Sequence, residues 1–311
     1  AISSSSPLAL KKKQSMANKV AKVLRWQRSS GHSVSERAGV KRAALAAAAV
    51  DPSPVSRYAI TFGETAVLHI GGEEVGSRRS SGFTVPELRL LADKLSKEGV
   101  ETEIVDLSEA LPEKLRKDNE AATLVIRNGA SVLLRDEDAA VCLLREQEDL
   151  SYDSQYWDAR RGRTLTKRAR HNLVFGEEAA TPSKDFKQYS VKAFRDLPHL
   201  AKFRAALPER LGEKALGLFA EGNHYFETSS GIGFHGDSER KIVICLSLGA
   251  SSTLRYCWRM PGSSENVGQV DIAVHHGDVY VMSEKATGFD WRCRSKVRVV
   301  HAAGAVKYIG S

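Results

Sequence analysis

The stretch that decides the fold is residues 222–240, GNHYFETSSGIGFHGDSER, which joins strand-like segments to two groups of polar side chains. In an extended strand, residues two positions apart point to the same side. Asn223 and Tyr225 therefore share one face, and His235 and Asp237 share another. An imidazole beside a carboxylate supplies two of the three ligands of a 2-His-1-carboxylate iron site. The stretch thus predicts part of a metal centre carried on β structure.

Downstream of this stretch, the chain has the pattern of β structure almost throughout. Five short segments are rich in β-branched and aromatic side chains, and Gly, Ser and Pro separate them. These segments are residues 241–248, 254–258, 267–274, 278–282 and 296–300. The pattern predicts an α+β protein with a C-terminal double-stranded β-helix, or jelly roll. The mouth of such a fold commonly holds a small ligand or a metal.

The preceding part of the chain alternates between strand-like and helix-like segments, which predicts a small α/β subdomain over residues 57–150. Thr84 and Glu87 form a capping-box pattern, so a helix is expected to run from there to about residue 98. The other expected strands are residues 58–62, 66–70, 101–107 and 122–127, and the other expected helices are residues 112–117 and 136–149. Residues 151–311 are expected to form the second domain, with helical signals at 198–203 and 208–219.

Residues 1–56 differ from the rest in composition. Residues 1–50 hold ten of the 46 basic residues and one of the 38 acidic residues. A Ser-rich, Arg-rich, acid-poor segment is typical of an organelle transit peptide, and residues 8–28 have the pattern of a basic amphipathic helix. The alternative is a basic tail, used as a nuclear address or to contact an anionic or membrane-bound assembly. The expected location is therefore intracellular, in a plastid, a mitochondrion or the nucleus.

The remainder of the chain is electrically balanced, with 36 basic and 37 acidic residues. This balance argues against a phosphate-binding surface over the whole body, although residues 160–170 are locally basic. No run of 18 apolar residues occurs, so no membrane-spanning helix is expected. The four cysteines form no CxxC pair, which predicts reduced thiols.

Five short motifs follow one another in residues 222–311, and their order is far more specific than any one of them. They are Asn223-x-Tyr225, Phe234-His235-Gly-Asp237, Leu246-Ser-Leu-Gly249, Gly277-Asp-Val-Tyr-Val-Met282 and His301-Ala-Ala-Gly304. In this order they resemble the AlkB-like Fe(II)/2-oxoglutarate-dependent dioxygenases, in particular an algal and giant-virus branch of that superfamily. The resemblance implies Fe(II), 2-oxoglutarate and O₂, and the hydroxylation or demethylation of a substrate. By family analogy alone, the substrate is a modified nucleobase of a nucleic acid.

The resemblance also implies that His235 and Asp237 are the first two iron ligands and that a histidine further downstream is the third. The candidates are His275, His276 and His301. His301 is predicted because it ends a β segment, where its ring can face inward. Related sequences carry no ligand at the positions of the other two.

The chain departs from the family pattern at one position. Related enzymes carry Trp/Tyr-x-His soon after the GDxxVM segment, whereas Trp291-Arg-Cys293 has a cysteine in place of that histidine. A thiolate is not the ligand expected for oxygen activation at such a site. Two hypotheses therefore stand: a dioxygenase completed by His301, or a non-catalytic dioxygenase-like structural or interaction subunit of a larger assembly.

The resemblance further implies a cation that binds the distal carboxylate of 2-oxoglutarate. Lys307 is favoured because it lies six residues after His301, on the same face of an extended strand, whereas Arg298 lies three residues before it. Asn223 and Tyr225 are expected to add hydrogen bonds to the same cosubstrate. At the substrate entrance, the sequence indicates Arg170, His171 and Asn172, with a solvated loop as the alternative.

Overall fold

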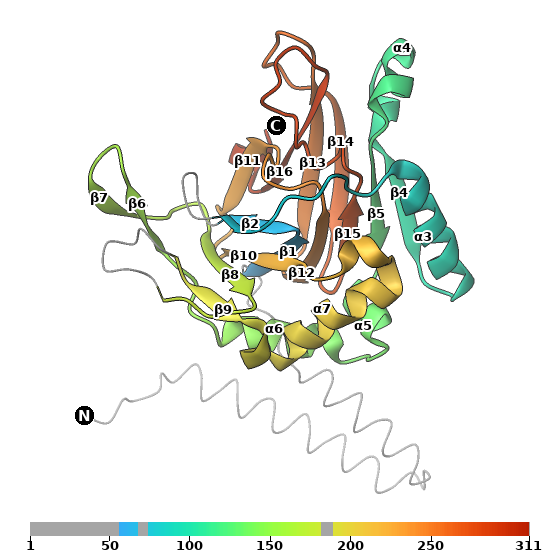
Figure 1. Ribbon diagram of the computed structural model, residues 1–311. Helices are drawn as coiled ribbons and strands as arrows, with labels where there is room; N and C mark the ends of the chain where they lie inside the picture. Colours follow the sequence, from blue (N-terminus) through green and yellow to red (C-terminus); the bar gives the residue numbers. More distant parts are fainter. Residues whose placement is uncertain (1–55, 68–73, 182–188, 311) are drawn as a thin grey trace, which may run out of the picture. The chain divides into compact units, whose positions relative to one another are not determined.

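Two sheets, one of eight strands and one of four, form the framework of the protein (Figure 1). The computed structural model describes residues 56–67, 74–181 and 189–310. The large sheet is antiparallel except for one parallel pair at its edge, β8 and β9. Its strands, in spatial order, are β4 (Thr102–Asp106), β5 (Ala122–Ile126), β15 (Val279–Met282), β12 (Val243–Gly249), β1 (Arg57–Gly63), β10 (Phe219–Tyr225), β8 (His171–Gly176) and β9 (Val191–Ala193).

The small sheet packs against the inner face of the large one through a core of aliphatic and aromatic side chains. Tyr256 and Trp258 are fully buried there, and Thr123 of the large sheet donates a hydrogen bond to the Tyr256 hydroxyl oxygen at 3.0 Å. The strands of the small sheet, in spatial order, are β11 (Gly231–His235), β16 (Arg298–Gly304), β13 (Ser252–Arg259) and β14 (Val267–Val274). Two further strand pairs are β2 (Thr65–Val67) with β3 (Glu74–Gly76), and β6 (Gln155–Asp158) with β7 (Arg163–Thr166).

Helices cover the outer face of the large sheet, where they bury a second core of leucines and phenylalanines (Figure 1). The four helices that contribute to it are α3 (Val85–Lys97), α5 (Gly129–Leu134), α6 (Ala139–Glu148) and α7 (Pro198–Leu211). The short helices are α4 (Glu113–Arg116), α8 (Val306–Ile309), η1 (Leu107–Ala110), η2 (Lys117–Asn119), η3 (Phe194–Asp196) and η4 (Glu213–Ala215). The capping box that begins α3 is confirmed: the Glu87 amide donates to the Thr84 hydroxyl, and the Thr84 amide donates to the Glu87 carboxylate.

Strand β1 alternates between the two cores and positions one face of the site. Tyr58, Ile60 and Phe62 point to the helical side, where they are buried. The alternate residues, which include Arg57 and Thr61, face the small sheet, as a period of two requires. Their neighbours across the strand are fixed by antiparallel pairing with β10 on one side and β12 on the other.

The expectation of an α+β protein is confirmed, and so are the five strands expected after residue 240. The boundary expected at residue 150 does not separate two domains, because strands from both sides of it share the large sheet. Contacts instead group the described residues into one compact unit. The jelly roll stays a prediction and is taken up below.

Three local expectations need correction. Residues 129–134 form a helix that the sequence pattern did not indicate, α5. The helical signal over residues 208–219 is correct only in its first part: α7 ends at Leu211, before Gly212 with φ of 92°, and after the short η4 a strand begins at Phe219. No strand was expected between residue 70 and the helix that begins near Thr84, but β3 lies there.

The predicted tail over residues 1–56 lies outside the described residues, apart from Ser56. Among the described residues, no helix is long and apolar enough to cross a membrane. All four cysteines are free, in agreement with the prediction of reduced thiols.

Candidate metal centre

Two histidines meet where the neighbouring strands β11 and β16 pair. His235 is the last residue of β11 and lies directly opposite His301 of β16. The centroids of the two imidazole rings are 4.5 Å apart. His301 is buried, with 7% of its side chain exposed, whereas 27% of the His235 side chain is exposed. Strand pairing therefore brings together two residues that are 66 positions apart in the chain.

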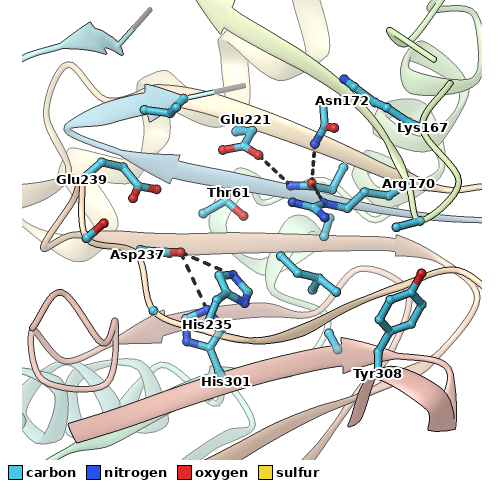
Figure 2. Close-up of a pocket in the computed structure, with 18 of the residues that line it drawn as sticks. Thr61, Lys167, Arg170, Asn172, Glu221, His235, Asp237, Glu239, His301 and Tyr308 are labelled. Atoms are coloured by element: carbon cyan, nitrogen blue, oxygen red, sulfur yellow. Dashed lines mark hydrogen bonds and ion pairs between the residues drawn. The ribbon is translucent and has the colours of Figure 1, made fainter. Parts of the chain in front are cut away.

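Asp237 completes a group of three potential metal ligands. Its Oδ1 lies 3.6 Å from Nε2 of His235 and 3.8 Å from Nε2 of His301 (Figure 2). The chain turns at Gly236, and the Asp237 amide donates to the Thr287 carbonyl at 2.9 Å, which fixes the turn. The three side chains named from the sequence are therefore brought to one point.

Hydrogen bonding and burial leave both imidazoles suited to bind a metal. Nδ1 of His235 lies 2.8 Å from the carbonyl oxygen of Gly233. Because a carbonyl oxygen only accepts, Nδ1 carries the proton and Nε2 keeps its lone pair for a ligand. Burial lowers the pKa of His301 well below its ordinary value, and the nearby His235 and Arg240 lower that pKa further. A neutral ring is the form that binds a metal ion.

The donor set fits a divalent transition metal. One ligand atom from each of the three residues lies within 4.8 Å of the other two. Neighbouring ligands on a metal with bonds of about 2.1 Å lie about 3 Å apart, so a small inward movement would complete the geometry. Two imidazoles and one carboxylate, with further positions open, are typical of non-haem Fe(II).

The other downstream candidates for the third ligand lie elsewhere. Nδ1 of His276 accepts a hydrogen bond from the Gly249 amide at 3.0 Å. Nδ1 of His275 lies 2.9 Å from the Ser251 hydroxyl. Cys293 is exposed, beyond the end of β15.

The three residues open onto a cavity of about 1420 Å³ between the two sheets. Its walls come from β1, β10, β12 and β15 of the large sheet, from β11 and β16 of the small sheet, and from the segment 161–170. This volume exceeds that of most pockets for a single drug-sized molecule. The cavity therefore has room for more than one small molecule.

Asn223 and Tyr225 of β10 both line this cavity, as expected for side chains on one face. Oδ1 of Asn223 accepts hydrogen bonds from Nε of Arg170 at 2.5 Å and from Nδ2 of Asn172 at 2.7 Å (Figure 2). These bonds fix the orientation of the amide; its NH₂ group donates one hydrogen to Oε1 of Glu221 at 3.5 Å and keeps the other for a ligand. Arg170 and Asn172, expected at the substrate entrance, thus line the cavity and orient Asn223.

His171 lies outside the cavity, on the opposite face of β8 from Asn172. Its ring stacks on Phe226, with the centroids 4.3 Å apart, and lies edge-on to His224. The reason is the period of two in a strand, which sends neighbouring side chains to opposite faces. The expectation that His171 lines a substrate entrance is therefore not met.

Neither cation expected to bind the cosubstrate carboxylate lines the cavity. The Arg298 guanidinium donates to the backbone carbonyls of Lys296, Trp291, Met260 and Ser263. Its donors are therefore occupied in holding loops together. Lys307 is exposed on α8, with Nζ 5.0 Å from the ring centroid of Tyr308. The extended strand assumed between His301 and Lys307 ends at Gly304.

Arg57 is a cation that the sequence pattern did not indicate. It is 6% exposed, and its Nε and Nη2 have no hydrogen-bond partner among the described residues. Its guanidinium carbon lies 3.9 Å from the ring centroid of Tyr225. Burial raises the pKa of the fully buried Cys245 thiol to about 11, and among smaller influences Arg57 lowers this pKa and Asp237 raises it. Arg57 does not line the cavity, but it lies against Tyr225, which does.

Arg240 supports the carboxylate side of the site. Its Nη2 bonds Glu221 at 2.8 Å and Glu239 at 2.9 Å. Burial alone would lower the pKa of Arg240, but the charges of Asp237, Glu221 and Glu239 outweigh burial and raise it. Arg240 thus balances the charges of three carboxylates on this side of the site.

Gly236 is required by close packing, and its replacement gives a testable prediction. A Cβ at this position would overlap the Gly288 carbonyl oxygen and would lie 2.8 Å from Cδ1 of Trp291. We expect Gly236→Ala to lower the free energy of unfolding by about 2 kcal/mol. We also expect weaker Mn(II) binding, because Asp237 must shift. Chemical denaturation and calorimetric titration measure the two effects.

Gly233→Ala is the matched control, because a Cβ on Gly233 meets nothing within 4 Å. It should leave both measurements unchanged. Equal effects of the two substitutions would show that packing at Gly236 does not hold the site.

The fold and the site together define a mixed α+β protein with a candidate mononuclear metal centre inside a cavity between two sheets. No family model matches the sequence. Over 253 residues the chain is 35% identical to the uncharacterized protein R156 of Acanthamoeba polyphaga mimivirus, a match that covers 80% of this chain and 96% of the viral protein. The chain therefore belongs to the same family as that viral protein.

Proposed function

We propose that the protein is an Fe(II)- and 2-oxoglutarate-dependent dioxygenase that hydroxylates or demethylates its substrate. The observation that carries the proposal is the convergence of His235, Asp237 and His301 at the cavity wall. A facial set of two imidazoles and one carboxylate leaves positions open for a bidentate cosubstrate and for O₂. When bound, iron and 2-oxoglutarate supply oxidative chemistry that inserts oxygen into a C–H bond.

Asn223 and Tyr225 in the wall of the cavity suit 2-oxoglutarate, and Arg57, which does not itself line the cavity, lies against Tyr225. Arg57 is a buried cation with two unused nitrogen donors, and such a fork matches a carboxylate. It lies against Tyr225, and Asn223 lines the cavity on the same face of the same strand. We propose that Arg57 binds the distal carboxylate and that Asn223 and Tyr225 add hydrogen bonds. This assignment replaces Lys307 and Arg298.

The proposal extends to the fold. Four strands of the large sheet (β10, β1, β12 and β15) face the four strands of the small sheet (β11, β16, β13 and β14). This arrangement supports a jelly roll in which the first strand of the described chain inserts between β10 and β12. Side chains from both sheets line the cavity around the site. On an N-methyl group, hydroxylation would be followed by release of formaldehyde.

The test is an anaerobic calorimetric titration with Fe(II) and 2-oxoglutarate, followed by an assay for succinate in air without a substrate. We expect wild-type protein to bind both and to form succinate slowly, and His235→Ala to form none. Binding of neither compound, with no iron-dependent succinate, would overturn the proposal in favour of a non-catalytic dioxygenase-like interaction subunit.

A further inference from the structure

A second buried cation, Lys167, lies in the wall of the cavity and has no role in the site described so far (Figure 2). The residue is 8% exposed, and its Nζ has no hydrogen-bond partner among the described residues. The nearest aromatic ring, Tyr189, has its centroid 5.4 Å from Nζ. An unpaired ammonium in such a position is costly, because burial removes most of its hydration.

The carboxylates that influence Lys167 are both engaged elsewhere. The Asp153 carboxylate accepts hydrogen bonds from the Ser190 amide at 2.9 Å and the Ser190 hydroxyl at 2.7 Å. The Glu221 carboxylate pairs with Arg240 at 2.8 Å. Lys167 lines the cavity, and its ammonium is buried with no anion of the described residues in hydrogen-bond contact.

Lys167 also has a cationic neighbour. Burial lowers the pKa of Lys167 to about 8; Asp153 and Glu221 oppose this shift, whereas Arg170 reinforces it. Lys167 and Arg170 both line the cavity, where an anion that contacts both would offset the repulsion between the two cations. Nε of Arg170 donates a hydrogen bond to Oδ1 of Asn223, and both residues line the cavity. This bond fixes the orientation of the Arg170 guanidinium.

The cavity wall around Lys167 and Arg170 is predominantly positive. The segment 161–170 lines the cavity and carries five basic residues and no acidic residue. Arg161 pairs with Asp158, and Arg163 and Arg168 are exposed. A rim of this kind attracts anions from solution and raises their local concentration.

We propose that Lys167 and Arg170 form a second anion-binding subsite, which binds an oxyanion of the substrate, a phosphate or a carboxylate group. The inference rests on the proposed function only in calling the ligand a substrate. The two cations line the cavity whichever reaction the protein catalyses. This subsite uses residues other than Arg57, so the cavity can hold two anions at once: the cosubstrate and the substrate. The expected substrate therefore carries an anionic group, which would lie beside segment 161–170 when the substrate is bound.

The test uses the full chain and two probes, inorganic phosphate and 2-oxoglutarate with Mn(II), measured by calorimetric titration. We expect Lys167→Met to weaken phosphate binding about tenfold or more, the loss typical of a charge-assisted hydrogen bond. The same variant should bind 2-oxoglutarate within about twofold of wild type. Arg57→Met should show the opposite pattern. Titration with acetate in place of phosphate shows whether the subsite prefers a carboxylate.

Lys97→Met is the matched control, because it removes one positive charge from the exposed end of α3 and should leave both affinities unchanged. Lys167→Met should melt at or above the wild-type temperature without ligand, since it removes an unpaired buried charge. Lys167→Gln serves as the second variant if the first does not fold.

The subsite is refuted if phosphate binds Lys167→Met as tightly as it binds wild type. Phosphate binding that depends on Lys167 in a protein that does not bind 2-oxoglutarate would keep the subsite and refute the proposed function. The two proposals therefore fail separately.

Discussion

Replacing His301 with alanine is expected to weaken Mn(II) or Fe(II) binding by at least about 100-fold. Loss of a residue that only orients a ligand already costs 10- to 100-fold, and loss of the ligand itself should cost more. Nε2 of His301 is buried and directed at Oδ1 of Asp237, 3.8 Å away. Without it, His235 and Asp237 remain as two ligands at a partly exposed edge, too few for tight binding. Anaerobic calorimetric titration measures the loss, and succinate formation should disappear with it.

His276→Ala is the matched control for this experiment. His276 was an alternative third ligand, and its ring instead accepts a hydrogen bond from the Gly249 amide. Its replacement should lower the free energy of unfolding by about 1 kcal/mol and leave metal affinity unchanged. If His276→Ala abolished metal binding while His301→Ala retained it, the assignment of the metal centre to His301 would be wrong.

The candidate metal centre could be named from the sequence because each part of it has a local signal. His235 and Asp237 lie two apart around a glycine, and His301 lies at the end of a β segment. What the sequence could not show is that β11 and β16 are neighbours with these two histidines opposite each other. Register between distant strands depends on the packing of whole sheets, which no short motif encodes.

The fold was predictable where hydrophobic pattern and capping act locally, as for α3 and for the strands after residue 240. It was not predictable where distant segments combine. β1 has the pattern of an ordinary strand, yet it lies between β10 and β12, whose residues lie more than 150 positions later in the chain. The expected boundary at residue 150 failed for this reason, since a linear division of the chain cannot represent an inserted strand.

The same insertion separates the proposed carboxylate-binding cation, Arg57 on β1, from His301 in the sequence. Arg298 and Lys307 were expected because they lie close to His301 in the chain. One signal was available: Arg57 shares a strand face with Ala59 and Thr61, both small. A long cation among small side chains has room to lie along the sheet, where Arg57 covers Tyr225.

Arg57→Met is expected to lower the affinity for 2-oxoglutarate, measured with Mn(II) bound, by roughly 100-fold. The expected loss is about 3 kcal/mol, typical of removing one partner from a buried, hydrogen-bonded charge pair. Metal affinity without 2-oxoglutarate should stay unchanged, because Arg57 is not a ligand. Arg57→Lys should recover part of the affinity, since it restores the charge without the two-pronged donor geometry.

Stability separates a binding role of Arg57 from a structural one. A structural arginine makes hydrogen bonds within the protein, as Arg298 does with four backbone carbonyls. Arg298→Met should therefore lower the melting temperature and leave the affinity for 2-oxoglutarate unchanged. Arg57 has two buried nitrogens without a partner, so Arg57→Met should leave the melting temperature without ligand unchanged or higher.

The effect of 2-oxoglutarate on the melting temperature also separates the two roles of Arg57. If Arg57 binds the carboxylate of 2-oxoglutarate, the ligand should stabilise the wild-type protein against unfolding, and this stabilisation should be lost when Arg57 is replaced. In wild type, 2-oxoglutarate with Mn(II) should raise the melting temperature, and in Arg57→Met this increase should be absent. If Arg57→Met lowered the melting temperature of the free protein and still bound 2-oxoglutarate normally, Arg57 would be structural, and the carboxylate would require a different cation in the cavity wall.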